Sequence, residues 1–251
     1  MSKASTASKA ETPPRTEVWR MFDRIAGRYD LLNHLLSLGQ DIRWRKKVSE
    51  FLPERKDLYL LDLATGTGDQ LLYLMKNDDR IKKALGLDLA REMLKVGRKK
   101  MARLHMENRI TLEEGDAERI GQSDNQFDVV TISFGIRNVT DVKKSLNEMN
   151  RVLKPGGRVL ILEFSLPGNK LLRNLYLYYF RHILPAVGSI ISGDGYAYRY
   201  LNRTVETFPY GDEFCALLRE CKFEAVSMRP LTFGIATVYY GDKNRPVNNN
   251  N

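Results

Sequence analysis

The chain has 251 residues, 43% of them hydrophobic, which is enough for one sizeable core and does not require a second independent domain. Its 40 Lys and Arg against 31 Asp and Glu give a net charge of +9. The basic residues are scattered along expected helices as solvated faces, so nucleic acid is not a favoured partner. No stretch reaches the roughly 18 apolar residues of a membrane span, and the N-terminus lacks the apolar core of a secretory signal. We therefore expect a cytoplasmic protein.

The two ends of the chain differ in composition from its middle. Residues 1–15 are rich in Ser, Thr, Ala, Lys and Pro, and residues 246–251 are mostly Asn, so we expect two disordered tails. Residues 16–245 are expected to form a single domain. Its two cysteines, Cys215 and Cys221, lie in an expected helix at a spacing that turns them toward different faces, and no cluster of metal ligands occurs. We expect neither a disulfide nor a metal.

Short apolar runs bounded by turn residues alternate with segments of helical periodicity. Apolar residues recur at helical spacing from Met93 to Leu104 and again from Val142 to Leu153, and Thr140 and Asp141 can cap the second of these helices. Strands that alternate with helices build a mostly parallel sheet with helices on both faces, an α/β fold. The expected strands are Leu58–Leu63, Ala84–Asp88, Ile110–Glu113, Asp128–Ser133, Arg158–Glu163, Glu224–Arg229 and Ile235–Tyr240.

The first expected strand is followed by a loop of small residues that runs to Asp69 and contains Gly66, Thr67 and Gly68. Small residues at the carboxyl end of a strand let a ligand approach the backbone closely. The loop is not a complete dinucleotide fingerprint, because Ala64 replaces the first glycine and the third is absent. Alone, such a loop is compatible with a purely structural turn.

Two further acidic residues give this loop a more specific meaning. Asp88 ends the second strand, where a carboxylate can accept hydrogen bonds from both hydroxyls of a ribose. Asp116 and Ala117 follow the third strand, which suits an adenine that needs one polar contact and a small neighbour, although an isolated Asp116 is also an ordinary turn residue. Together the three strand ends predict an adenosine site, and we interpret it as a site for S-adenosylmethionine.

Four segments make the sequence resemble the quinone C-methyltransferases of ubiquinone and menaquinone biosynthesis. They are Tyr29 to Trp44, the loop from Leu61 to Asp69 with Gly86 to Asp88, Ser133 to Asp141, and Arg151 to Ser165. The first and third are not general to methyltransferases and are the more specific ones. One departure is visible, since many members have a His three residues before the Trp of the first segment, where this chain has Asp41.

The resemblance implies a Rossmann-like, seven-stranded class I methyltransferase fold of the demethylmenaquinone methyltransferase type, with N-terminal helices and a helical lid. It implies that S-adenosylmethionine, with no metal, methylates a carbon of a prenylated quinol ring, with demethylmenaquinol as the expected substrate and a benzoquinol as the other option. Cofactor contacts carry over to Thr67, Asp88, Asp116, Ala117 and Ser133.

Methylation of an aromatic carbon needs an electron-rich ring and a stabilised oxyanion. We expect Arg137 and Asn138, after the fourth strand, to donate to that oxyanion. Arginine is a poor base because its pKa stays above about 12, so proton removal is assigned to an ordered water, Asp30 or Tyr29. The competing interpretations are a salt bridge for Arg137 and helix packing or capping for Tyr29 and Asp30.

Residues 166–209 are aromatic and apolar and form too long a segment for an ordinary connection. We expect a lid that lines a tunnel for a prenyl tail and touches the inner face of the membrane; the alternatives are packing on the sheet edge or a contact in a homodimer or a quinone-biosynthesis complex. The apolar residues of the expected lid are Leu171, Leu172, Leu175, Leu177, Ile183, Leu184, Ile190 and Ile191.

Two rival functions remain open. The nearest is another small-molecule methyltransferase of the same fold, and the second is a nucleic-acid-binding protein that retains a nucleoside pocket.

Overall fold

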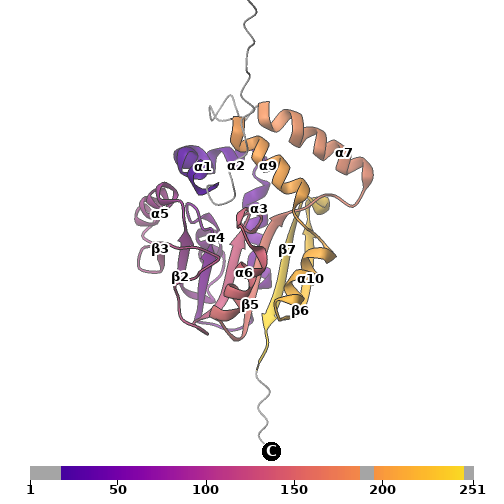
Figure 1. Cartoon of the computed structure of the whole chain (residues 1–251). Coiled ribbons are helices and arrows are strands. Elements are labelled where there is room, and N and C mark those ends of the chain that lie inside the picture. The colour runs from indigo at the N-terminus through magenta and orange to yellow at the C-terminus, as the bar shows by residue number, and fades with distance from the viewer. Residues whose placement is uncertain (1–17, 187–194, 246–251) are drawn as a thin grey trace, which may run out of the picture.

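The structure is a computed structural model and describes residues 18–186 and 195–245 (Figure 1). The expected tails, 1–15 and 246–251, and the lid residues Ile190 and Ile191 lie outside this described part. Three short α-helices lead into the sheet, and 3₁₀ turns follow the first and the third. These helices are α1 (Val18–Ile25), α2 (Tyr29–Leu36) and α3 (Gln40–Lys47).

Seven strands form one sheet in the order β3-β2-β1-β4-β5-β7-β6. The first five are parallel, and β7 runs antiparallel to both of its neighbours. The order reverses between β1 and β4, and in open α/β sheets ligands bind at such a point, outside the carboxyl ends of the strands. The expected seven-stranded, mostly parallel sheet is confirmed. The strands are β1 (Leu58–Leu63), β2 (Ile81–Asp88), β3 (Ile110–Glu114), β4 (Phe127–Ser133), β5 (Leu153–Phe164), β6 (Phe223–Leu231) and β7 (Ala236–Lys243).

Helices cover both faces of the sheet, because successive strand residues point to opposite sides. Leu60 and Val129 join the core shared with α3, α4 (Asp69–Asn77) and α5 (Arg91–Arg103). Leu61 and Val130, one residue further on, join the core shared with α6 (Val142–Val152) and α10 (Asp212–Glu220). Asp141 caps α6 as expected, its side chain accepting a hydrogen bond from the Lys144 backbone N–H.

The expected lid lies between β5 and α10 and contains α7 (Lys170–Tyr178), a π-helical turn η5 (Tyr179–Ile183) and α9 (Gly195–Thr207). Figure 1 shows α7 and α9 gathered with α1 and α2 at one end of the sheet. That end is where the candidate site lies. No helix in the described ranges is both long and apolar enough to cross a bilayer.

Candidate active site

The loop after β1 turns sharply into α4. Gly66 and Gly68 have φ of +58° and +80°, a left-handed backbone that favours glycine, and the loop therefore needs both. Thr67, between them, donates a 2.6 Å hydrogen bond from its hydroxyl to Asp30 Oδ1. The loop is thus tied to α2 as well as to the sheet.

A cleft of about 370 Å³ opens at the carboxyl ends of β1, β2, β3 and β4. Five of the seven expected cofactor residues line it. Thr67 and Gly68 are not among its lining residues; Thr67 points toward Asp30 instead, and Gly68 begins the turn into α4. The five lining residues are Gly66, Asp88, Asp116, Ala117 and Ser133.

Asp88 is held by backbone donors on both sides of its carboxylate. Oδ2 accepts from the Gly66 N–H at 2.7 Å, and Oδ1 accepts from the Ala90 N–H at 2.8 Å. Burial raises the pKa of Asp88, and these hydrogen bonds oppose the rise. Each carboxylate oxygen has two lone pairs, and the backbone N–H of Leu89 also interacts with this carboxylate, so acceptor capacity remains for a ligand in the cleft.

The other polar residues of the cleft also have protein partners. Asp116 Oδ1 accepts from the Glu118 backbone N–H at 2.8 Å, which is the turn role considered for it, and its side chain still lines the cleft. Ser133 donates to Gln70 Oε1 at 2.8 Å. Asn138, expected to act on the acceptor, lines this cleft instead, and its buried Oδ1 has no hydrogen-bond partner.

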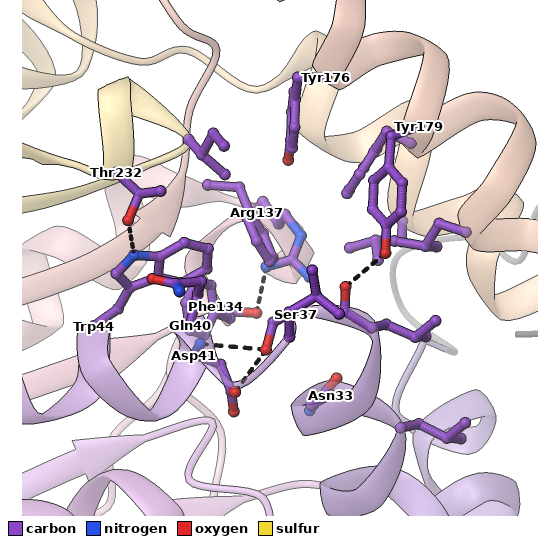
Figure 2. Close-up of a pocket in the computed structure, with 18 of the residues that line it drawn as sticks. Asn33, Ser37, Gln40, Asp41, Trp44, Phe134, Arg137, Tyr176, Tyr179 and Thr232 are labelled. Atoms are coloured by element: carbon purple, nitrogen blue, oxygen red, sulfur yellow. Dashed lines mark hydrogen bonds between the residues drawn. The ribbon is translucent and has the colours of Figure 1, made fainter. Parts of the chain in front are cut away.

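A second cavity, of about 390 Å³, lies between α2, α3, α7, η5 and the carboxyl ends of β4 and β5 (Figure 2). Most of its lining is aliphatic or aromatic. Phe22, Tyr29 and Phe134 line both this cavity and the cleft, so the two spaces share one wall. Phe134 has φ of +58°, a left-handed backbone unusual for a bulky residue, and such strain concentrates at functional sites.

Arg137 enters the apolar cavity from the turn after β4. Its Nη1 donates to Glu163 Oε1 at 2.8 Å and to the Phe134 carbonyl, while its buried Nε has no protein partner. Burial raises the pKa of Glu163, and the Arg137 guanidinium opposes that rise. The salt bridge and the position in the cavity therefore coexist, since one part of the guanidinium binds Glu163 and another part remains for a ligand.

Tyr29 lies on the shared wall, as its expected role requires. Burial raises the pKa of its hydroxyl, and the charges of Arg45 and Arg137 and a hydrogen bond with Asn33 oppose this. A neutral phenol in this place can donate a hydrogen bond to a developing oxyanion, but it is a poor base. Tyr29 therefore suits binding better than proton removal.

Asp30 lines neither the cleft nor the apolar cavity. Its carboxylate accepts from Thr67 Oγ1 and from Lys100 Nζ, both at 2.6 Å, and Lys100 also binds Asp69 at 2.6 Å. The packing interpretation of Asp30 describes these contacts better than a role as base does.

Several polar residues in or beside the apolar cavity were not expected from the sequence. Ser37, Asp41 and Arg45 line it, and His34 binds Asp41 from behind at 2.8 Å. Leu38 and Gly39, with φ of +52° and +72°, form the turn between α2 and α3, which brings residues seven apart into contact. Two signals were available in the sequence, the Ser37-Leu38-Gly39 break and Asp41 in place of the His of many family members, and neither gives the direction of the side chains.

Comparison with known proteins gives this geometry a context. The model of the ubiE/COQ5 methyltransferase family matches residues 8–243. The ubiquinone/menaquinone biosynthesis C-methyltransferase UbiE of Geobacter sulfurreducens is 45% identical over 89% of this chain and 87% of its own length. The demethylmenaquinone methyltransferase of Thermus thermophilus is 43% identical over 89% of this chain and its full length.

Solved structures agree on the fold. A SAM-dependent methyltransferase of Thermotoga maritima, described as a possible histamine N-methyltransferase, has a TM-score of 0.65 and 19% identity over 90% of this chain and 99% of its own. The [4+2]-cyclase SpnF has a TM-score of 0.68 and 14% identity over 93% and 97%. Because a cyclase shares the fold, architecture alone does not identify the reaction; the sequence relatives do, and they confirm the expected S-adenosylmethionine-dependent C-methyltransferase. The chain belongs to the ubiE/COQ5 methyltransferase family.

Proposed function

We propose that this enzyme transfers a methyl group from S-adenosylmethionine to a ring carbon of demethylmenaquinol. The observation that carries the proposal is the wall shared by the cleft at the strand ends and the apolar cavity, made by Phe22, Tyr29 and Phe134. A nucleoside on one side and a prenylated ring on the other would meet there. Relatives named demethylmenaquinone methyltransferase, from Thermus thermophilus and Bacteroides fragilis, support the choice of acceptor.

The cleft suits the adenosyl part of the methyl donor, whose sulfonium supplies an activated methyl group. Asp88 offers free lone pairs to the two ribose hydroxyls. Asp116 and Ala117 stand where the adenine amine and ring would lie, and Gly66 leaves its backbone open to the ligand. Asn138 also lines the cleft, and its Oδ1, which has no hydrogen-bond partner in the protein, adds a further acceptor there.

The acceptor side of the wall would hold the ring by position and charge. Arg137 and Arg45 both line the apolar cavity, and each has a buried Nε without a hydrogen-bond partner. Two guanidinium groups in an apolar site stabilise negative charge on a ring oxygen strongly, because little water screens them. Tyr29 completes this side of the wall, and positioning of the ring carbon near the methyl group does the rest.

The lid suits a long apolar tail and contact with the membrane surface. Leu175 of the lid, together with Leu38 and Phe233 from outside it, lines the cavity and is 65% exposed, the other two being 82% and 80% exposed, so these three residues form an apolar rim of the cavity. Apolar side chains exposed together at the surface mark interaction sites. Helix α7 carries Lys170 and Arg173 and no acidic residue, which suits an anionic lipid surface.

The test is to incubate the enzyme with labelled S-adenosylmethionine and a panel of reduced quinones, then to locate the transferred methyl group by mass spectrometry and NMR. We expect label on the ring carbon of demethylnaphthoquinols, with faster turnover for tailed than for tailless forms. Label on an oxygen, or on none of the reduced quinones, would overturn the proposal. Label on benzoquinols alone would replace the acceptor.

A further inference from the structure

Proton removal from the quinol hydroxyl needs an acceptor inside a largely apolar space. Among the described residues that line the cavity, Asp41 is the only one with a carboxylate, and there is no Glu, Lys or His. The remaining titratable groups of the lining are phenols and the guanidinium groups of Arg45 and Arg137, which are poor proton acceptors. Asp41 is 5% exposed, so it faces the cavity and its neighbours rather than bulk water.

The contacts of Asp41 fix both of its oxygens. Ser37 Oγ donates to Oδ1 at 2.7 Å and accepts from the Asp41 backbone N–H at 3.3 Å, and His34 Nδ1 lies 2.8 Å from Oδ2. Figure 2 shows Ser37 bonded to Asp41 within the cavity lining. Ser37 also lines the cavity, so a ligand hydroxyl that donates to Ser37 Oγ is one hydrogen bond from the carboxylate.

Further groups lie around this carboxylate. Arg45 is one helical turn along α3 and is buried like Asp41. On α4, Asp69 Oδ2 lies 3.9 Å from His34 Nε2 and also binds Lys100 of α5, while Tyr73 is close enough to Asp41 to interact with it electrostatically. His34 has a side chain that is 30% exposed, so it links the buried carboxylate to the solvent side.

We propose that Asp41 accepts the proton of the quinol hydroxyl through the hydroxyl of Ser37, with His34 as the residue that positions Asp41. The inference rests on the proposed function, because it requires a hydroxyl-bearing ring in this cavity. It assigns proton removal to α3 and leaves oxyanion stabilisation to Arg137.

The step balances without another reactant. The quinol O–H bond breaks, its proton passes to Ser37 Oγ as the Ser37 proton passes to Asp41 Oδ1, and the electron pair stays on the quinol oxygen. The adjacent ring carbon bonds the methyl group, and the electron pair of the S–CH₃ bond stays on sulfur. That ring carbon then loses its hydrogen as a proton to water, and the product oxygen takes back the proton held by Asp41. One proton is released overall.

The experiment compares the full-length wild-type enzyme with Asp41→Asn, using dithionite-reduced demethylnaphthoquinol and measuring kcat from about pH 5.5 to 9.5. General base catalysis contributes about 10²- to 10⁴-fold, so we expect Asp41→Asn to lose at least about 10²-fold at neutral pH. The wild-type kcat should be low at acidic pH, rise with pH and reach a plateau at higher pH. The variant should instead rise steadily with pH, because the phenolic hydroxyl, with a pKa of about 10, must then ionise alone.

Three further variants make the result specific. Ser37→Ala interrupts the same proton path at a different residue, so it should change the pH profile in the same way. This variant replaces Asp41→Asn as the test if Asp41→Asn does not fold. His34→Gln should cause a smaller loss and move the acidic limb. Glu50→Gln, an exposed carboxylate just after α3, should behave as wild type. Calorimetry with S-adenosylmethionine should give unchanged affinity for all four.

The outcomes distinguish a failure of the proposed function from a failure of the assignment of proton removal to Asp41. A wild-type enzyme that methylates no reduced quinone defeats the proposed function, and the inference falls with it. A wild-type enzyme that methylates the quinol, together with Asp41→Asn and Ser37→Ala variants that keep the wild-type pH profile, overturns the inference alone. A loss that is equal at every pH also overturns it, since that pattern is expected of a purely structural residue.

Discussion

The cleft at the strand ends and the apolar cavity share three lining residues but are built in different ways. The cleft is made largely of backbone and short side chains at the ends of four strands, and those strands are anchored in two buried cores. The cavity is made of long side chains from short helices, and α7, which forms part of its wall, has no buried residue. We infer that the donor side of the site is rigid and the acceptor side adaptable.

This difference suits the two ligands. A nucleoside has one shape and is recognised by fixed hydrogen bonds, whereas a prenyl tail is long, flexible and without polar groups. Few polar contacts are therefore needed on the acceptor side, and Arg137 and Asp41 are the charged groups that we propose act on the ring. The predictions below perturb first the rigid side, then the ring, then the tail.

Of the single substitutions, Asp88→Ala should have the largest effect, which is a loss of affinity for S-adenosylmethionine. It removes both acceptors for the ribose hydroxyls and also leaves the N–H groups of Gly66 and Ala90 without a partner. Hydrogen bonds to a charged group contribute about 1.5–3 kcal/mol each, so the loss of two should make S-adenosylmethionine bind about 10²- to 10⁴-fold more weakly by calorimetry. Asp88→Asn, which keeps one acceptor oxygen, should lie between. Unchanged affinity in Asp88→Ala would remove the ribose assignment.

Arg137→Ala should spare cofactor affinity and lower turnover by about 10²-fold, the usual effect of losing one oxyanion donor. It also strands Glu163 without its ion pair, and breaking a buried pair costs about 3–5 kcal/mol. Arg137→Lys, which keeps the charge, should recover most of the stability but less of the turnover, because an ammonium lacks the planar fork of donors. Full activity in Arg137→Ala would exclude Arg137 from the mechanism.

The same variant has a distinct pH dependence of stability. Burial raises the pKa of Glu163, and Arg137 opposes the rise, so its removal raises the pKa further. The folded protein then keeps a proton that the unfolded chain releases, and stability falls as pH rises above the unfolded pKa. The Tm of Arg137→Ala should therefore drop more between about pH 5 and 8 than that of the wild type, and parallel curves would contradict the coupling.

The cleft could be predicted from the sequence more completely than the apolar cavity, because the cleft lies at strand ends and the cavity is lined by side chains of short helices. The bounds of β1 were predicted to the residue, because this strand is a short apolar run bounded by turn residues. Asp88, Asp116 and Ser133 were expected at one site, because parallel strands end at a common edge of the sheet. Neither Ser37 nor Asp41 was expected to act, since the direction of their side chains depends on how α2 and α3 pack across the left-handed turn at Gly39. β5 starts at Leu153 rather than at the expected Arg158, because Leu153 already pairs with Phe127 across an irregular register.

Leu175→Asp tests the tail and should have the smallest effect. Leu175 lines the cavity and is largely exposed, whereas Leu171, on the same helix and also exposed, lies outside the cavity lining. A charge at Leu175 would lie along the path of a tail and is costly to desolvate.

With detergent-dispersed substrates, Leu175→Asp should reduce kcat/KM about 10-fold for long-tailed quinols and little for tailless ones, while Leu171→Asp leaves both unchanged. Sedimentation with anionic vesicles should fall in both variants, because each replaces an exposed leucine of α7 by a negative charge. Equal losses on tailed and tailless quinols in Leu175→Asp would favour a packed lid over a tunnel, and vesicle binding unaffected by either change would place the membrane contact elsewhere.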